Sequence, residues 1–415
     1  MSISEVLGFH SEISRRSTLL QPHIVIGITH SQTCLTLTGR LRGLREAGFR
    51  VTLVSSPGEL LDTTAQREGV ERIALSIERE IAPFKDIVSL VRLWRLLRKL
   101  RPDITEFSTP KAGLLGTIAA MLCGVPRRVY MLRGLKLETC TGFKRRVLLM
   151  AERLTAACSH VVLCNSPSLR AEALALGIAP RSKLHLLGDG STNGVDVERF
   201  SPGASDVREQ MHISAEIPVI GFVGRLTRDK GVPDLLEAFD RILLFKPDAR
   251  LLLVGWFDKA EDALCKDLRS RIENDPRIYL TGFVRDTSSY YRAMDVMVLP
   301  TYREGFPNVV LEAAATGIPV VTTLCTGSRD SVVPEVTGLL IPPGYPEAIS
   351  EAVLTLLCDP EKRRRMGKAA RVWIVEHFQD RRVLALANNY YKSLLEVSPK
   401  NKSIESVTVL AVEPR

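Results

Sequence analysis

The sequence predicts an α/β fold made of two Rossmann-like, doubly wound domains that face a central cleft. Two observations carry this prediction. The chain has 415 residues, which is too long for one ordinary hydrophobic core and is typical of two domains of similar size. Both halves alternate short β-branched runs with helical stretches, the pattern of parallel sheets that are covered by helices on both faces.

Five strands are predicted in each half from these runs. In the first half they cover His23–Thr29, Val51–Val54, Asp103–Phe107, Arg127–Leu132 and His160–Cys164. In the second half they cover Pro218–Val223, Arg250–Val254, Arg277–Thr281, Asp295–Leu299 and Pro319–Thr322. Between the halves, residues 200–206 are small, polar and rich in turn formers, so we expect a hinge there.

These signals set the expected domain boundaries. We predict a first domain over residues 1–200, with flexible residues at 1–21, and a second domain over 201–378. A helical pattern at 379–396 follows the second sheet, and residues 397–415 are typical of a flexible tail.

The composition indicates a soluble globular protein of the cytoplasm. No uninterrupted apolar run reaches the roughly 20 residues needed to span a bilayer, and the N-terminus lacks the apolar core of a signal peptide. The eight cysteines are dispersed without a Cys-x-x-Cys pair. In a chain of this length that pattern favours reduced thiols over a disulfide framework or a zinc site.

Positive charge is concentrated in the first half. Residues 1–200 contain 28 Lys and Arg against 18 Asp and Glu, a net charge of +10, whereas the whole chain carries +9. We therefore expect an anionic partner on that half, either phosphate groups or an anionic membrane surface. The helix predicted over Asp86–Leu100 either lies on a membrane with its basic face or is a core helix with a solvated side. No nucleic-acid-binding motif is present, so nucleic acid is not expected as a partner.

The second predicted domain opens on a glycine-rich turn, Gly-Phe-Val-Gly-Arg-Leu-Thr-Arg-Asp-Lys-Gly at 221–231. Gly224, at the end of a first strand, lets the backbone approach a ligand, and the helix from about Val232 offers its positive end. Arg225 and Lys230 add two cations that could neutralise a diphosphate, first as bound substrate and then as leaving group. The alternative is a glycine turn with two solvated charges. The turn is neither a dinucleotide fingerprint nor a P-loop.

Two carboxylates eight positions apart follow the strand at 295–299. Glu304 precedes a Gly-Phe-Pro turn and Glu312 lies in an alanine-rich helix, so both are predicted at the crevice where doubly wound domains bind ligands. Each carboxylate accepts hydrogen bonds from vicinal hydroxyls, so the pair could hold a polyhydroxylated ligand. The alternative is a charge favoured by the helix dipole and a solvated helix position. If Glu312 is buried, it needs a partner.

Together these segments resemble the retaining glycosyltransferases of family 4, whose fold is the two-domain GT-B architecture. The motifs are Gly-Arg-Leu-x-x-x-Lys-Gly at 224–231, Arg-Glu-Gly-Phe-Pro-x-x-x-Leu-Glu-Ala at 303–313 and Asn-Gly-Val-Asp at 193–196. The stretches at 109–116, 133–139 and 190–194 are similar to a bacterial subgroup that builds surface polysaccharides.

The resemblance implies roles for individual residues. Arg225 and Lys230 would bind the donor pyrophosphate, Glu304 would hold donor-sugar hydroxyls, and these three are the catalytic candidates. Glu312 would bind the ribose. The donor site is completed by Gly224, Gly305, Phe306, Pro307 and Asn308. The helix at 379–396 would cross back to pack on the first domain.

On the first domain, Lys111, Arg133 and Glu138 are the candidates for binding an acceptor or a phosphate. Lys111 lies where a strand ends and a helix begins, which makes either an anion site or a polar loop with a solvated lysine. Many members of the family carry a histidine where this chain has Arg133. A guanidinium stays protonated and cannot act as a general base, so a mechanism that needs a histidine there is in doubt.

The implied activity is transfer of a hexose or N-acetylhexosamine from a nucleotide-diphosphate sugar, with UDP expected, to a glycan acceptor, with the anomeric configuration retained. The acceptor is expected to be linked to polyprenyl diphosphate, or else soluble, in polysaccharide biosynthesis at the inner face of the plasma membrane. Two alternatives are a nucleotide-sugar 2-epimerase of the same fold and a non-catalytic nucleotide-binding member of an assembly complex. No Asp-x-Asp follows a strand, so neither a metal nor another cofactor is expected.

Overall fold

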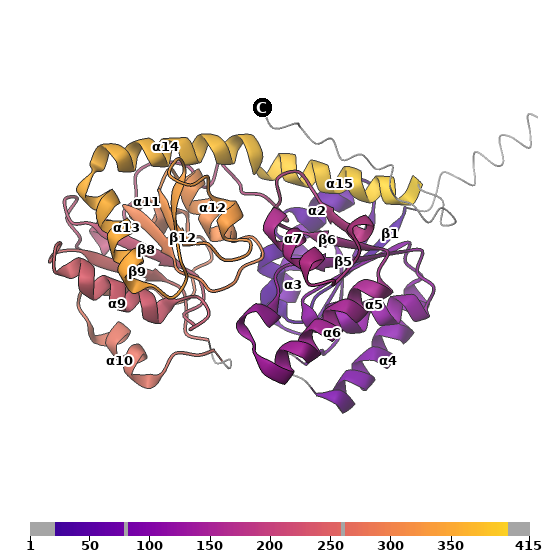
Figure 1. Cartoon of the computed structure of the whole chain (residues 1–415). Coiled ribbons are helices and arrows are strands. Elements are labelled where there is room, and N and C mark those ends of the chain that lie inside the picture. Colours follow the sequence, from indigo (N-terminus) through magenta and orange to yellow (C-terminus); the bar gives the residue numbers. More distant parts are fainter. Residues whose placement is uncertain (1–20, 79–81, 259–261, 397–415) are drawn as a thin grey trace, which may run out of the picture. The chain divides into compact units, whose positions relative to one another are not determined.

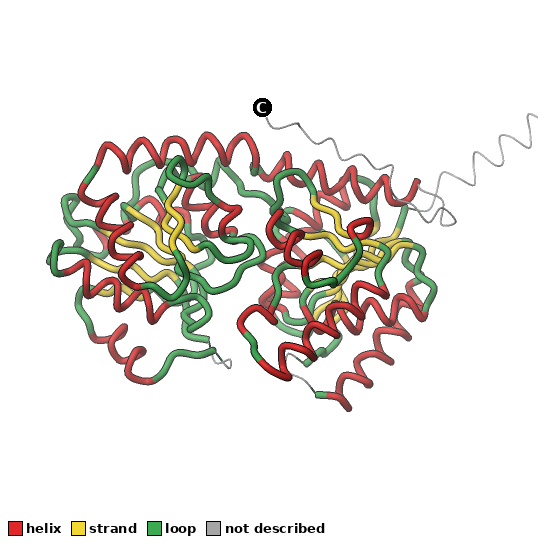
Figure 2. The backbone as a smooth tube through the Cα atoms, in the orientation of Figure 1, coloured by secondary structure: helices red, strands yellow, loops and turns green. Residues whose placement is uncertain are grey.

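The computed structural model describes residues 21–78, 82–258 and 262–396. Its strands form two parallel sheets, one of seven strands in the order β3-β2-β1-β4-β5-β6-β7 and one of six in the order β10-β9-β8-β11-β12-β13 (Figures 1 and 2). Read from the edge, six strands of each sheet follow the order 3-2-1-4-5-6 of doubly wound folds. The predicted fold class is therefore confirmed.

The elements of the first sheet and the segments that follow its strands are β1 (His23–Gly27), η1 (Ser31–Leu37), α2 (Arg40–Glu46), β2 (Arg50–Ser55), α3 (Glu59–Glu68), β3 (Glu71–Ala74), α4 (Pro83–Leu100), β4 (Ile104–Ser108), α5 (Pro110–Leu122), β5 (Arg127–Leu132), η2 (Lys136–Thr139), α6 (Gly142–Cys158), β6 (Val161–Cys164), α7 (Pro167–Ala175), η3 (Arg181–Lys183) and β7 (Leu184–Leu186). A loop and the short α8 (Val207–Gln210) then lead to the second sheet.

The elements of the second sheet and its helices are β8 (Val219–Val223), α9 (Val232–Leu243), β9 (Arg250–Val254), α10 (Lys266–Asn274), β10 (Ile278–Leu280), α11 (Ser288–Arg292), β11 (Val296–Leu299), α12 (Asn308–Ala315), β12 (Val320–Thr323), η4 (Arg329–Ser331) and β13 (Gly338–Ile341). Three helices close the described chain: α13 (Pro346–Cys358), α14 (Pro360–His377) and α15 (Asp380–Glu396).

All ten predicted strands are present, but three strands of the structure were not predicted. These are β3, β7 and β13, each of only three or four residues. The strand β3 lies at a sheet edge and most of its residues are exposed. All three are edge strands with too few residues to form the β-branched run on which the prediction depended, and β3 is polar as well.

The chain packs into two compact units. Among the described residues, unit 1 consists of 21–78, 82–130, 158–160 and 391–396, and unit 2 of 131–157, 161–258 and 262–390. The domain boundaries predicted from the sequence remain predictions. The expected flexible tail at 397–415, and residues 1–20 of the expected flexible segment 1–21, lie outside the described residues.

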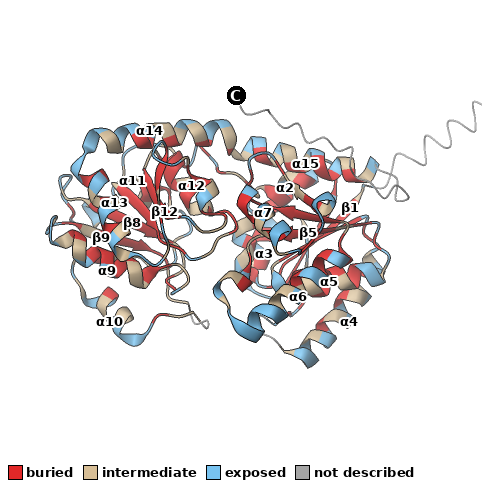
Figure 3. Ribbon diagram, viewed as in Figure 1, coloured by how far each residue is buried: buried red, intermediate tan, exposed pale blue. Residues whose placement is uncertain are grey.

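Each unit has its own apolar core. In unit 1, Val25 and Phe107 of the sheet pack with Leu93 of α4 and Ala119 of α5. In unit 2 the strands β8, β9, β11 and β12 are almost fully buried, and α9 packs beside α13 while α12 packs beside α14. Figure 3 shows these strands as buried along their length, with helices exposed on one side. Strands covered on both faces are typical of parallel sheets.

The last helix contributes a buried polar contact to unit 1. Tyr391 of α15 donates a hydrogen bond to Glu106 of β4, which also pairs with Arg40 of α2, and the guanidinium of Arg40 lies 3.0 Å from the tyrosine oxygen. Arg40 and Glu106 are 1% and 0% exposed. The end of α15 that belongs to unit 1 is thus held by hydrogen bonds to a buried ion pair. None of the described helices is both long and apolar enough to cross a membrane.

Candidate active site

The predicted donor-binding residues gather at one edge of the second sheet. The strands β8 and β11 are neighbours in this sheet, and the strand order reverses between them. Gly224 follows β8 and Glu304 follows β11 after a short loop. Because ligands of doubly wound sheets bind outside the carboxyl ends at this point, the location fits the prediction.

The loop after β8 places two cations at this edge. Gly224 has a φ of 146°, and Gly231, with a φ of 70°, caps α9 so closely against the chain that a methyl group on it would lie 2.0 Å from the carbonyl oxygen of Pro300. Only glycine fits such a contact at a positive φ. The loop is therefore held against the residues that follow β11.

Arg225 and Lys230, the two predicted phosphate-binding cations of the loop, both make ion pairs in the described structure. The Nζ of Lys230 lies 2.5 Å from Oε1 of Glu304, and Nη1 of Arg225 lies 2.5 Å from Oδ2 of Asp258. The Lys230 and Glu304 side chains are 17% and 14% exposed. Burial alone would lower the pKa of Arg225, but the hydrogen bond to Asp258 and nearby carboxylates raise it. The expected alternative of two solvated charges is thus wrong.

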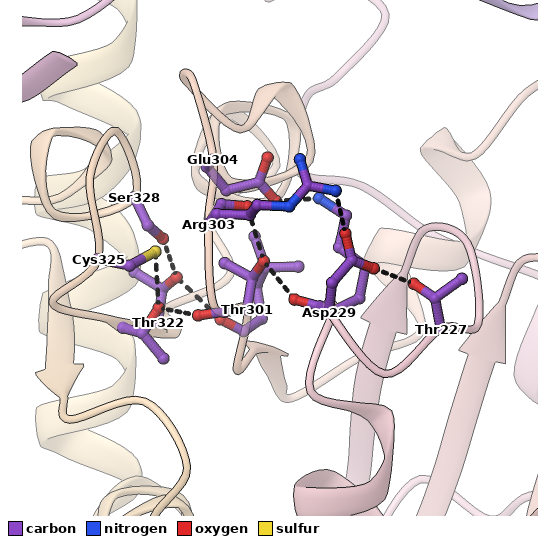
Figure 4. A network of polar contacts seen from close by, with 11 residues as sticks. Thr227, Asp229, Thr301, Arg303, Glu304, Thr322, Cys325 and Ser328 are labelled. Atoms are coloured by element: carbon purple, nitrogen blue, oxygen red, sulfur yellow. Dashed lines mark hydrogen bonds and ion pairs between the residues drawn. The ribbon is translucent and has the colours of Figure 1, made fainter. Parts of the chain in front are cut away.

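Asp229 joins the two loops, although no role was predicted for it from the sequence. Its carboxylate accepts hydrogen bonds from Thr227 at 2.6 Å and from Arg303 at 2.7 Å, as Figure 4 shows. Its backbone oxygen accepts a hydrogen bond from the backbone N–H of Tyr302 at 2.9 Å. Burial works to raise the pKa of Asp229, but the hydrogen bond with Asp262 and the neighbouring cations hold it well below its usual range. Its position in the sequence, between the motif cations Arg225 and Lys230, was the only pattern that could have predicted this role.

Glu312 has a hydrogen-bond partner, as was predicted for the case that it is buried. Its Oε2 accepts a hydrogen bond of 2.8 Å from the hydroxyl of Tyr291 on α11. Burial raises the pKa of Glu312 to about 7, although the Tyr291 hydrogen bond opposes this shift. The solvated helix position that was the alternative for Glu312 is therefore wrong. Nothing in the sequence marks Tyr291 as its partner.

The turn after Glu304 is packed against residues that follow β5 and β6. A methyl group on Gly305 would lie 2.1 Å from the carbonyl oxygen of Arg133 and 2.9 Å from Nδ2 of Asn165. The ring of Phe306 packs 5.2 Å from that of Phe378, between centroids. Pro307 and Asn308 then begin α12. The polar network of this turn extends to Thr301, Thr322 and Ser328, at the carboxyl ends of β11 and β12 (Figure 4).

Two of the three predicted acceptor or phosphate candidates lie near this turn. Arg133 approaches Gly305 through its backbone carbonyl. Glu138 of η2 is hydrogen-bonded to Thr326, and burial raises its pKa despite that bond. The third, Lys111, belongs to unit 1, where its Nζ lies 2.6 Å from Asp86 and the side chain is 14% exposed. Lys111 is therefore not the solvated surface lysine of the alternative interpretation.

Within the described ranges, no three His, Cys, Asp or Glu side chains are grouped so that they could hold a metal ion. The charged side chains predicted to bind a ligand here are those of Arg225, Lys230, Glu304 and Glu312, and of these the structure pairs Lys230 with Glu304 and places Glu312 against Tyr291. Cations suit phosphate groups and carboxylates suit hydroxyls. A doubly wound sheet with this set at its switch point, following another such sheet in the same chain, is typical of GT-B glycosyltransferases.

Comparison with known proteins agrees with this class. A family model described as glycosyl transferases group 1 matches residues 205–373, and one described as a glycosyl transferase 4-like domain matches residues 37–190. The capsular polysaccharide biosynthesis glycosyltransferase CapM of Staphylococcus aureus is 34% identical over 372 residues, which cover 89% of this chain and 97% of that relative. The chain therefore belongs to glycosyltransferase family 4 and is a glycosyltransferase.

Two further proteins are similar over most of the chain. The UDP-Gal:alpha-D-GlcNAc-diphosphoundecaprenol alpha-1,3-galactosyltransferase of Escherichia coli is 30% identical over 310 residues, or 72% of this chain and 78% of that protein. The structure of sucrose-phosphate synthase from Thermosynechococcus elongatus superposes with a TM-score of 0.76 at 22% identity, covering 91% of this chain and all of that one. The second likeness concerns the fold.

Proposed function

We propose that this glycosyltransferase moves a hexose or N-acetylhexosamine from a UDP-sugar to a glycan carried on polyprenyl diphosphate, in polysaccharide biosynthesis, with retention of the anomeric configuration. The observation that carries the proposal is the contact of Lys230 with Glu304, beside Arg225, at the switch point of the second sheet. It sets a cation for the diphosphate directly against a carboxylate for sugar hydroxyls. The names of the S. aureus and E. coli relatives support the polysaccharide, UDP and polyprenyl parts of the proposal.

In this proposal the protein stabilises charge and takes no covalent part. Arg225 and Lys230 bind the diphosphate of the donor and stabilise the negative charge that it gains as a leaving group. Glu304 orients the sugar and Glu312 the ribose. Retention then proceeds with the leaving phosphate assisting the incoming hydroxyl, so a protein nucleophile and a base at position 133 are not needed. The two cations take the place of a metal ion, and no cofactor is required.

The proposal includes peripheral binding to an anionic membrane, since a polyprenyl-linked acceptor is confined to one. Two helices support this. On α4, Phe84 and Ile87 are 87% and 60% exposed, and the helix carries Arg92, Arg95, Arg98 and Lys99. On α6, Phe143 and Met150 are 81% and 69% exposed, next to Lys144, Arg145 and Arg146. Exposed apolar side chains beside basic ones are typical of interfacial helices.

The reaction is tested with purified protein, UDP-glucose, UDP-galactose or UDP-N-acetylglucosamine, and a synthetic glycan on polyprenyl diphosphate. We expect a new glycosidic product from one of the donors, and NMR of that product should show the anomeric configuration of the donor. A reaction without acceptor serves as a control, because an epimerase would convert the intact donor there. Conversion of the donor to an epimer, or an inverted product, would contradict the proposal.

Membrane binding is tested by sedimentation with vesicles of phosphatidylglycerol and phosphatidylcholine, and of phosphatidylcholine alone. We expect binding to the anionic vesicles only, and at least fivefold weaker binding for Phe84→Ser with Phe143→Ser. The matched control is Phe245→Ser, because Phe245 is 69% exposed but lies outside α4 and α6. Equal binding by all three proteins would contradict a role for these helices.

A further inference from the structure

Asn165 is a buried polar residue beside the turn that follows Glu304. The proposed function gives Asn165 no role. It follows β6, and its side chain is 6% exposed. Its Nδ2 lies next to Gly305, since a methyl group there would be 2.9 Å away, and its backbone oxygen accepts a hydrogen bond of 2.7 Å from Ser191. The backbone contact fixes the residue, so the amide is held against the turn that carries Glu304.

The side-chain oxygen of Asn165 has nothing to bind within the described part of the chain. Its Oδ1 is buried and accepts no hydrogen bond from residues 21–78, 82–258 and 262–396, and the same holds for Oε2 of Glu138. A buried acceptor without a hydrogen bond costs about 1–3 kcal/mol. Native proteins keep few such groups, and each needs an explanation. Two of them near one catalytic turn suggest acceptors that a ligand is meant to satisfy.

Glu138 belongs to the same neighbourhood as Glu304. Burial raises the pKa of the Cys325 thiol to about 11, and the charges of Glu304 and Glu138 both add to this rise. The positive charge of Arg303, the residue before Glu304, lowers the pKa of the Glu138 carboxyl and so partly opposes the effect of burial. Glu138 and Glu304 meet at Thr326, because the carboxyl of Glu138 is hydrogen-bonded to Thr326 and the backbone oxygen of Thr326 accepts a hydrogen bond of 3.3 Å from the N–H of Glu304. Asn165 lies next to Gly305, the residue after Glu304.

The chemistry of these groups selects the ligand class. An amide oxygen and a carboxylate oxygen both need hydrogen-bond donors. The oxygens of an ionised diphosphate are acceptors and would be repelled by Glu138, whereas a sugar hydroxyl donates a hydrogen bond to either group. Glu138, one of the candidates for an acceptor or a phosphate, is therefore unsuited to phosphate.

We propose that Asn165 and Glu138 form a second hydroxyl-binding part of the sugar site, near Glu304, and that they contribute to the choice of sugar. This inference rests on the proposed function, because it takes the ligand at Glu304 to be a sugar. The same chemistry suits the sugar of the donor or that of the acceptor. Both residues bind and orient hydroxyls in this arrangement, and neither takes part in bond breaking.

The test compares Asn165→Ala, Glu138→Gln and the wild type in binding UDP and the three UDP-sugars by calorimetry, and in transfer kinetics. The control is Asn274→Ala, which removes an exposed amide that bonds only within α10. If the donor sugar is bound, UDP affinity should stay within about twofold while UDP-sugar affinity and kcat/KM fall about tenfold to a hundredfold. If the acceptor sugar is bound, only the acceptor KM should rise by that factor.

Two results would overturn the inference. One is that the folded variants, with the melting temperature of the wild type, keep every binding and kinetic constant. The other is that UDP affinity falls as much as UDP-sugar affinity, which would indicate a structural role. If Asn165→Ala melts early, Asn165→Asp, which keeps the shape and the acceptor oxygen, should restore the sugar constants. A wild type that binds UDP-sugars but transfers none would contradict the proposed function, while the binding comparison would still decide this inference.

Discussion

Lys230 and Glu304 form an ion pair at the candidate active site, with 2.5 Å between Nζ and Oε1. The two residues follow different strands, β8 and β11, so the pair connects the two loops on which donor binding is proposed to depend. A diphosphate that binds Lys230 has to compete with Glu304 for the ammonium group. In the proposed function, binding of the donor would then free the carboxylate to accept hydrogen bonds from sugar hydroxyls.

The first prediction separates the two members of this pair. Lys230→Ala should weaken UDP binding at least tenfold, because a charge-assisted contact to phosphate is lost. Glu304→Gln should leave UDP binding equal or tighter, since Lys230 no longer has an anionic competitor, but should lower kcat by about a hundredfold or more. Calorimetry with UDP and initial rates with the UDP-sugar measure these effects.

Lys362→Ala is the matched control for this pair, because Lys362 of α14 makes an ion pair of 3.4 Å with the exposed Glu335 and belongs to neither loop nor to α4 or α6. It should change neither constant. Full activity of both Lys230→Ala and Glu304→Gln would contradict the site assignment. Weaker UDP binding by Glu304→Gln would contradict the competition between the carboxylate and the diphosphate.

The second prediction uses the partly buried carboxyl of Glu312. Burial raises the pKa of this carboxyl from 4.5 to about 7 in the folded protein. At pH values between 4.5 and 7, the native state therefore holds a proton that the unfolded chain has lost. Its contribution to stability is complete below about pH 4.5 and is lost as the pH rises through about 7. At about 1.4 kcal/mol for each pKa unit, the loss is about 3 kcal/mol.

Glu312→Gln tests this contribution because glutamine keeps the acceptor for Tyr291 but does not titrate. Above pH 7 the variant should unfold at a higher urea concentration than the wild type, and below pH 4.5 the difference should vanish. The midpoint is measured at several pH values from 4 to 8.5. Parallel pH profiles of the two proteins would show that Glu312 does not titrate in this range.

The third prediction concerns the close approach at Gly305. In Gly305→Ala the methyl group would meet the carbonyl oxygen of Arg133 at 2.1 Å, and a backbone atom cannot move aside as a flexible side chain can. The turn must shift, at a cost on the order of 1–3 kcal/mol, and kcat should fall about a hundredfold because Glu304 moves with it. Gly203→Ala is the control, since its nearest neighbour would be 3.6 Å away. An active, equally stable Gly305→Ala protein would contradict the described contact.

Much of this site could be predicted from the sequence because it depends on topology. Parallel strands place their carboxyl ends at one edge, so motifs that follow β8 and β11 had to meet. The partners of the site residues depend instead on which side chains meet across loops distant in the sequence. No local pattern links Glu312 to Tyr291, Arg225 to Asp258 or Asn165 to Gly305.

Arg133 illustrates the same limit. The sequence directs attention to its charge, because a histidine is common at that position in the family. In the structure, its contact with Gly305 is made by the backbone carbonyl, which any residue at position 133 would supply.

The strands β3, β7 and β13 were missed for a related reason, since their place in a sheet is decided by neighbouring strands and not by their own composition.

The fourth prediction concerns the buried pair of Arg40 and Glu106 in unit 1. Removing one partner leaves the other charge buried without compensation, which typically costs 3–5 kcal/mol. Glu106→Ala should therefore lower the urea midpoint strongly and loosen α15, whose Tyr391 shares the carboxylate. Glu71→Ala, which removes the exposed partner of Arg50, should cost at most about 1 kcal/mol. Equal effects of the two substitutions would contradict the structural role of the pair.

The fifth prediction is that transfer does not need a metal ion. In the proposed function, Arg225 and Lys230 supply the positive charge that a divalent cation supplies in other transferases. Dialysis against EDTA should therefore leave the transfer rate within about twofold, and added Mg²⁺ or Mn²⁺ should not increase it.

Arg225→Ala should lower the rate, and Mg²⁺ should restore part of it, because the ion replaces a missing charge at the leaving group. A wild-type rate that falls more than tenfold on chelation and returns with Mg²⁺ would mean that the two cations do not suffice.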